Sequence, residues 1–213
     1  MRLEALVRLA GALPCFDLPL VMQAFDDKRE VARVQLSRWM KQGRVIGLRR
    51  GMYTLADMYR RAPVSPAALA GLLYRPSYLS GLWALGHHDM IPERVVWLTC
   101  VTTRGPRRFE NPFGTFDYRN VKRDCFFGYR AATDGATNLL VAEPEKALLD
   151  HWHLSEGEWT TDRLAEMRYQ NFELVAPERL HEYALRYRSP RLDRAVARWL
   201  ALGVQAEDGT VAL

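Results

Sequence analysis

The chain has 213 residues, of which 48% are hydrophobic and 26% charged, and its formal net charge is +5 at pH 7. This length suits one large domain or two small ones with an ordinary core. Because it has no run of about 18 apolar residues and no signal-peptide profile, we expect neither membrane insertion nor secretion. Three dispersed cysteines (Cys15, Cys100 and Cys125) predict reduced core thiols of a cytoplasmic protein.

Positive charge is concentrated near the N-terminus. Residues 1–62 contain 12 Lys/Arg and 6 Asp/Glu, a net charge of +6, whereas residues 63–213 contain 18 and 19, a net charge of −1. This asymmetry predicts an N-terminal module that binds a polyanion, joined to a body with another task.

Two short helices are predicted first. Residues 2–12 carry apolar side chains at helical spacing. The second helix is predicted at residues 18–25, with Asp17 as its N-cap and Pro19 in its first turn.

A third helix is predicted from Asp27, whose side chain would form a capping box with Glu30, to about Gly43. At about 100° per residue, its apolar side chains fall on one arc and its cations on the other. The residues expected to face the core are Ala32, Leu36, Trp39 and Met40. The opposite side carries Arg33, Val34, Ser37, Arg38 and Lys41.

Two short strands, 44–48 and 52–55, are then predicted as a hairpin, with Gly51 supplying a positive φ at the turn. Three helices followed by a hairpin is the order of a winged helix-turn-helix. We therefore expect residues 1–61 to form a DNA-binding domain of this kind.

This segment is the main functional signal, because Lys28 to Arg50 contains eight Lys/Arg and only one acid, Glu30. Arg33, Ser37 and Arg38 are expected to contact base edges or phosphates. Wing-tip arginines would enter a minor groove or hold the backbone. The complete set of expected DNA contacts is Lys28, Arg29, Arg33, Gln35, Ser37, Arg38, Lys41, Arg44, Arg49 and Arg50. The alternative is a charged face that is merely solvated.

Residues 62–66 predict a linker, and residues 66–213 a second, mixed-sheet α/β domain with C-terminal helices. Helices are expected at 66–73 and 77–87, then a central strand at 94–103. Further strands are expected at 108–110, 115–118, 125–130 and 138–142. Residues 143–153 and 161–202 are expected to be helical, with Pro177 and Pro190 as separators.

Two groups of motifs carry a resemblance to a known family. The first is Leu36-Ser37-Arg38-Trp39, Gly43, Arg50-Gly51 and Tyr53 in the basic segment. The second is PSYLSGLWALGHHDMIPE (76–93), VTTRGPRRFENPFGTFDYRNV (101–121), FFGY (126–129) and AEPEKALLDH (142–151). Together they resemble the AbiEi antitoxins of type IV toxin–antitoxin systems, whereas the helices after Leu154 match nothing in that family.

The resemblance implies a bacterial, cytoplasmic, non-enzymatic antitoxin. Its winged helix would bind double-stranded DNA at its own promoter, and its C-terminal domain would counter a nucleotidyltransferase-like toxin, with or without direct contact. Tyr78, Ser80, Glu145 and Lys146 match family positions and are expected to be structural. The alternative is a stand-alone winged-helix regulator whose second domain senses a ligand or dimerises.

Other constellations are weaker. Arg104, Arg107 and Arg108 predict either a second anion site or a loop kept soluble by charge. His87-His88-Asp89 and His151-Trp152-His153 lack the ligand spacing of zinc sites, so no metal is expected. No nucleotide loop, G-x-S-x-G or H-E-x-x-H motif occurs, and we expect neither a catalytic residue nor a cofactor.

Overall fold

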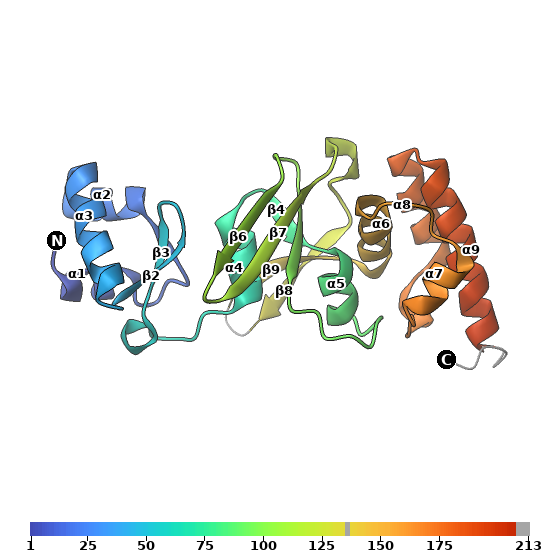
Figure 1. The fold of residues 1–213 in the computed structure, drawn as a ribbon, viewed down its shortest axis with the longest axis horizontal. Coiled ribbons are helices and arrows are strands. Elements are labelled where there is room, and N and C mark those ends of the chain that lie inside the picture. The colour runs from blue at the N-terminus through green and yellow to red at the C-terminus, as the bar shows by residue number, and fades with distance from the viewer. Residues whose placement is uncertain (135–136, 208–213) are drawn as a thin grey trace.

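A computed structural model describes residues 1–134 and 137–207 of the chain. Within these ranges the protein is a mixed α/β fold with nine α-helices and two β-sheets, which confirms the predicted fold class. Figure 1 shows an elongated arrangement, with the N-terminal helices at one end, the larger sheet in the middle and the C-terminal helices at the other end. No helix in the described ranges is both long and apolar enough to span a membrane.

The first module combines three helices with a small sheet in the strand order β1-β3-β2. Its elements are α1 (Leu3–Ala10), β1 (Phe16–Asp17), α2 (Leu18–Phe25), α3 (Arg29–Lys41), β2 (Val45–Arg49), β3 (Met52–Leu55) and η1 (Asp57–Tyr59). One hydrophobic cluster, which includes Leu6, Leu36 and Trp39, holds the helices to the hairpin. The two-residue strand β1 was not predicted.

Local signals explain most boundaries of this module. The Asp17 carboxylate accepts a hydrogen bond from the Leu20 amide (2.9 Å), as its N-cap position predicts. The turn between β2 and β3 has φ +76° at Gly51, as expected. The predicted capping box is wrong, because Lys28 is the N-cap of α3 and Asp27 lies 3.5 Å from the N-terminal ammonium group.

The second module is built on a six-stranded mixed sheet in the order β6-β7-β5-β4-β9-β8. Its elements are α4 (Pro66–Leu73), β4 (Ser77–Leu79), α5 (Gly81–His87), β5 (Leu98–Thr102), β6 (Arg107–Asn111), β7 (Gly114–Asn120), η2 (Arg123–Cys125), β8 (Tyr129–Asp134), β9 (Thr137–Ala142) and α6 (Pro144–Leu154). The apolar strand β5 is internal to the sheet, as predicted.

Helices cover both faces of this sheet. Tyr118 points to the α4 side, where its hydroxyl donates to the Ala70 carbonyl (2.6 Å). Tyr78 points to the other side, where its hydroxyl donates to Asp150 of α6 (2.9 Å). Alternation of side chains along each strand thus builds a three-layer core.

The C-terminal segment consists of α7 (Thr161–Glu166), η3 (Phe172–Leu174), α8 (Pro177–Tyr187) and α9 (Pro190–Glu207). Pro177 and Pro190 each open a helix, because proline fits the first turn, where no intrahelical donor is needed. Their predicted role as separators is confirmed.

Two predictions in the second module are wrong. Residues 77–79 form strand β4 between β5 and β9 instead of the start of a helix, so sheet pairing overrides local helix propensity. The predicted strand 125–130 is interrupted by Gly128, whose φ is +67°, and β8 starts only at Tyr129. A positive φ is incompatible with a continuous extended strand.

The two modules touch through the hairpin. Leu48 of β2 is buried in the larger hydrophobic cluster. Its carbonyl accepts a hydrogen bond from the side-chain Nδ2 of Asn111 at the end of β6 (3.2 Å). The Nε of Arg49 donates to the Leu73 carbonyl at the end of α4 (2.5 Å). The hairpin is therefore part of the first module in the sequence, but its side chains pack against both modules.

Candidate nucleic-acid interface

Helix α3 turns one side to the core and the other to solvent. Ala32, Leu36 and Trp39 are buried, as predicted from their spacing. Met40 is 37% exposed, so its expected place in the core is wrong. It lies at the edge of the buried side, where its Sδ covers Gly47 of β2.

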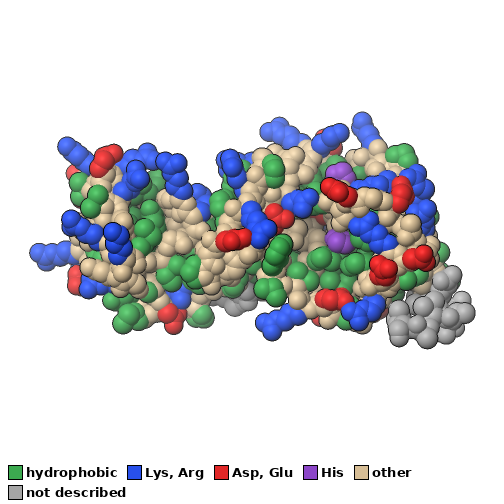
Figure 2. Space-filling view, in the orientation of Figure 1, with side chains coloured by type: hydrophobic (Ala, Val, Ile, Leu, Met, Phe, Trp, Pro, Cys, Tyr) green, Lys and Arg blue, Asp and Glu red, His purple; other side chains and the backbone are tan. Residues whose placement is uncertain are grey.

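The outward side of α3 and its N-cap carry exposed cations. Within the described ranges, the side chains of these residues make no hydrogen bond or ion pair. They are Lys28, Arg29, Arg33, Arg38 and Lys41. Figure 2 shows Lys and Arg side chains standing out from this end of the molecule. These charged groups are therefore exposed to solvent and do not stabilise the fold through contacts with described residues.

A groove of about 400 Å³ lies between α3 and the hairpin. Arg29 and Arg33 line it from the helix, while Arg49 and Arg50 line it from the strand and turn. Glu110 of β6 is the acidic residue of the lining. A concave surface with cations on two walls concentrates positive potential and suits a polyanion.

The two wing-tip arginines occupy different positions. Arg50 is exposed, whereas Arg49 is half-buried and donates through Nε to Leu73, and through Nη1 to the Arg50 carbonyl (3.2 Å). Arg49 thus holds the hairpin on the second module. Sequence reasoning could not foresee this, because the acceptor is a backbone carbonyl 24 residues away.

The remaining residues expected at the interface are less exposed. Gln35 and Ser37 are partly buried on α3. Arg44 is also partly buried and lines a separate hollow with Glu4, Arg8 and other residues of the α1 side. The structure thus brings Arg29, Arg33 and Arg50 around one groove and leaves Arg44 apart.

The second basic cluster does not form a single site. Arg104 donates to the Arg75 carbonyl (3.1 Å), and its guanidinium lies over the Tyr74 ring (4.4 Å to the centroid). Arg108 pairs with Glu110 (2.7 Å) and lies over Trp97 (4.6 Å). Of these three arginines, Arg107 is the one whose side chain has no such contact to a described residue.

The histidines have contacts typical of packed side chains. The Nε2 of His88 lies 2.8 Å from the Ala142 carbonyl oxygen, and the His87 ring stacks on Trp83. In the described part of the chain, no three His, Cys, Asp or Glu side chains are grouped so as to hold a metal ion. Burial, with a smaller effect from nearby Arg163, lowers the pKa of His151 to about 4.

Tyr78, Ser80 and Lys146, which were expected to be structural, meet in a closed polar cluster. Asp150 accepts hydrogen bonds from Tyr78, from Ser80 (2.7 Å) and from Tyr187 (2.6 Å), and it pairs with Lys146. Burial lowers the pKa of Lys146, opposed by the Asp150 charge. Because Lys146 and Asp150 are completely buried, the geometry fits the structural role expected for this region. Asp150 was not singled out from the sequence, although its i,i+4 spacing from Lys146 was a usable signal.

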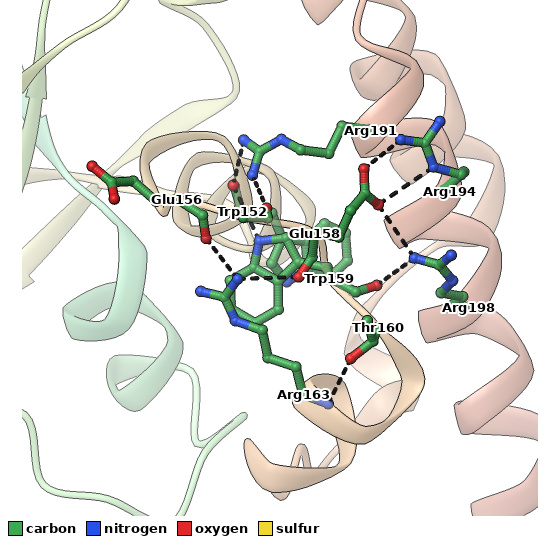
Figure 3. Close-up of polar contacts among 10 residues, drawn as sticks. Trp152, Glu156, Glu158, Trp159, Thr160, Arg163, Arg191, Arg194 and Arg198 are labelled. Carbon is green, nitrogen blue, oxygen red and sulfur yellow. Dashed lines mark hydrogen bonds and ion pairs between the residues drawn. The ribbon is translucent and has the colours of Figure 1, made fainter.

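A second set of arginines lies in the C-terminal segment and contacts the chain itself (Figure 3). Arg191 donates to the carbonyls of Trp152, His153, Ser155 and Gly157 at distances of 2.6–3.0 Å. These contacts satisfy carbonyls at the end of α6 and in the following loop. The arginines of α9 are therefore structural, unlike those of α3.

Compared with known proteins, the sequence matches no family model, and no curated protein is significantly similar to it.

Proposed function

We propose that this protein binds duplex DNA through α3 and the β2–β3 hairpin, as a winged helix does. The observation that carries the proposal is the row of exposed cations on α3, which have no intramolecular partner within the described ranges. DNA affinity arises largely from neutralising phosphates with such side chains. In the described part of the second module, many arginines are instead engaged by carbonyls or carboxylates, among them Arg104, Arg130, Arg168 and Arg191.

The docking follows from the shape of the surface. A helix about 10–12 Å in diameter fits the major groove, which is about 12 Å wide. With α3 in that groove, Arg50 at the hairpin turn would contact the flanking backbone. Arg49 is left out of the proposed contacts, because its guanidinium donates to Leu73. Arg44 is left out because it lies on the α1 side.

Fluorescence anisotropy with a labelled duplex from the promoter region of the chain's own gene tests this proposal. The slope of log affinity against log salt concentration should fall by about 2–3 units in the Arg33→Ala/Arg38→Ala/Lys41→Ala variant, since each phosphate contact contributes roughly 0.9. A control variant with the same loss of charge is Arg94→Ala/Lys122→Ala/Arg123→Ala, at exposed sites of the second module. Equal slopes for both variants would contradict the proposal.

We further propose that the chain is an AbiEi-like antitoxin that represses its own operon and counters a nucleotidyltransferase-like toxin. The support is the resemblance over segments 76–93, 101–121 and 142–151. In this role the first module controls expression, and the second opposes the toxin with or without a stable complex.

The genomic neighbourhood and a rescue assay test the antitoxin role. A nucleotidyltransferase-like gene should lie beside this one, and co-expression of the chain should restore growth of cells that make the toxin. Arg104→Ala/Arg107→Ala/Arg108→Ala is assayed in parallel for DNA binding, for rescue and for the free energy of unfolding. Loss of binding or rescue at unchanged stability would support an anion-binding role for these arginines. Absence of such a gene, or failure to rescue, would remove the antitoxin role but not DNA binding.

A cavity beside α4 supports a second candidate function, a ligand-sensing regulator. Its volume is about 360 Å³, and its lining includes the Phe126 and Tyr129 rings and Arg75. Ser77, also in the lining, is buried, and its Oγ has no hydrogen-bond partner within the described residues. An apolar cavity with a few polar groups is the usual form of a small-molecule site. Tightening or loosening of DNA binding by an aromatic carboxylate such as benzoate would favour this candidate.

A further inference from the structure

Two valines stand on the side of α3 that faces solvent. Val31 is 53% exposed and Val34 is 52% exposed. At about 100° per residue, Val34 lies roughly 160° around the helix from the buried Leu36, near the middle of the exposed side. An isolated exposed valine needs no explanation. These two are neighbours at spacing i,i+3 and are surrounded by charge.

Cations outnumber acids around this apolar spot, since Glu30 is the one acid of α3. Arg38 lies one turn after Val34, and Ser37 lies beside it at spacing i,i+3. Arg33 and Lys41 are exposed on the same side. Two occupants fit an apolar centre surrounded mainly by cations, namely a second copy of this chain and a nucleic acid.

Charge selects between them. A second copy packed on this side would bring the cations of α3 against the same cations of its partner, and such like-charge contacts are unfavourable. Duplex DNA places phosphates opposite the cations and base edges opposite the centre of the helix. The apolar group that the major groove offers is the C5-methyl group of thymine.

We propose that Val34, assisted by Val31, contacts the methyl group of thymine in the major groove and is a specificity-determining residue of this protein. The inference rests on the proposed DNA-binding function and adds a chemical class of target to it, namely A·T pairs under the middle of α3. Arg33, Arg38 and Lys41 supply affinity through phosphates or other base edges, while the valines distinguish thymine from cytosine.

The test uses DNA that differs by single methyl groups. The full-length chain first selects its preferred duplex from a random-sequence pool, and each thymine of that duplex is then replaced singly by deoxyuridine. At one or two positions this replacement should raise the Kd about fourfold, because the protein no longer buries a methyl group there. Uracil pairs as thymine does, so hydrogen bonding and charge are unchanged.

Protein variants complete the comparison. Val34→Ala should bind the thymine duplex more weakly and should no longer distinguish thymine from uracil at the affected position. Val34→Thr keeps one methyl group and should retain part of the discrimination. Val204→Ala, at a 60% exposed position of α9, should retain all of it. Since these side chains are exposed, their replacement leaves the core intact.

The possible results separate this inference from the function on which it rests. If the chain binds no duplex, both fail. If it selects a sequence but every uracil substitution leaves the Kd unchanged, or Val34→Ala keeps the full discrimination, DNA binding stands and the role of Val34 is overturned. A change of oligomeric state in Val34→Ala, measured by sedimentation, would assign the valines to a second copy and would also overturn it.

Discussion

Helices α3 and α9 each carry two arginines at spacing i,i+4, but these pairs have opposite environments. Arg194 and Arg198 of α9 both contact Glu158, and Arg198 also donates to the Trp159 carbonyl (2.7 Å). Arg29 and Arg33 of α3 are exposed, and their side chains have no such partner in the described ranges. The same local pattern therefore serves internal structure in one helix and remains available for a partner in the other.

The two helices differ in what offsets the repulsion between like charges. Like charges at i,i+4 destabilise an isolated helix slightly, so they persist where something offsets the repulsion. In α9 the offset is the carboxylate of Glu158 and the loop carbonyls, as Figure 3 shows. In α3 we infer that it is the phosphate backbone of DNA.

The largest expected effect is on folding stability at α9. Arg191→Ala should lower the free energy of unfolding by about 2–4 kcal/mol, because a charged donor shared by several acceptors is lost and the carbonyls are left without partners. Urea denaturation measures the change. Arg191→Lys is the informative control, because an ammonium group keeps the charge but lacks the planar fork that reaches four carbonyls. A loss below about 0.5 kcal/mol for Arg191→Ala would remove the structural role of this arginine.

The next effect is a pH dependence in the same region. His151 has a folded-state pKa of about 4, below the ordinary value of 6.5 for a histidine, because burial and nearby Arg163 disfavour its charged form. Its stabilising contribution is therefore complete above pH 6.5 and is lost as the pH falls from 6.5 towards 4. This contribution should be about 2 kcal/mol smaller at pH 5 than at pH 8.

The variant His151→Gln isolates this contribution. The free energy of unfolding is measured at pH 8, 6.5 and 5. As the pH falls, it should decrease less in the variant than in the wild-type chain. Other titrating groups contribute equally to both proteins, so their effect cancels when the two are compared. Helix α3 contains no histidine, so the Arg33→Ala variant should follow the wild-type pH profile. Parallel profiles for His151→Gln and wild type would show that His151 is not buried in its neutral form.

Much of the fold could be predicted because local signals coincide with element ends. Asp17 caps α2, and Pro66, Pro177 and Pro190 each start a helix. The errors occur where non-local pairing decides. The segment at Ser77 has helical composition but is held as a strand by neighbours on both sides, and such pairing is not visible in sequence periodicity.

The candidate interface was predictable only in part. Amphipathic spacing identified the exposed cations of α3, since burial of Ala32 and Leu36 fixes which side faces solvent. The separation of Arg49 from Arg50 was not predictable, because it depends on docking of the hairpin against the Leu73 carbonyl. The closed cluster around Asp150 likewise requires three distant segments to meet.

A smaller effect distinguishes the two arginines of the hairpin. Arg50→Ala should reduce the salt slope of DNA binding by about 0.9, the value for one lost phosphate contact, and leave stability unchanged. Arg49→Ala should instead lower stability by about 1 kcal/mol through loss of its hydrogen bond to Leu73, with little change in slope. Anisotropy titrations and urea denaturation of both variants measure the two quantities. The opposite assignment of effects would show that Arg49 leaves Leu73 to contact DNA.

The smallest effect is the most direct test of the comparison between the two helices. Arg29→Ala should raise the stability of the free protein by about 0.2–0.5 kcal/mol at low salt, because it removes an i,i+4 repulsion with Arg33 and a cation from the positive end of α3. The gain should shrink as added salt screens the charges. Arg198→Ala relieves the equivalent repulsion with Arg194 but should lower stability, since contacts to Glu158 and the Trp159 carbonyl are lost. Replacing an arginine by alanine should therefore change the free energy of unfolding in opposite directions in α3 and in α9. Urea denaturation at two salt concentrations measures both changes. Equal signs would mean that the α3 arginines also have partners within the protein and are not left for an external polyanion.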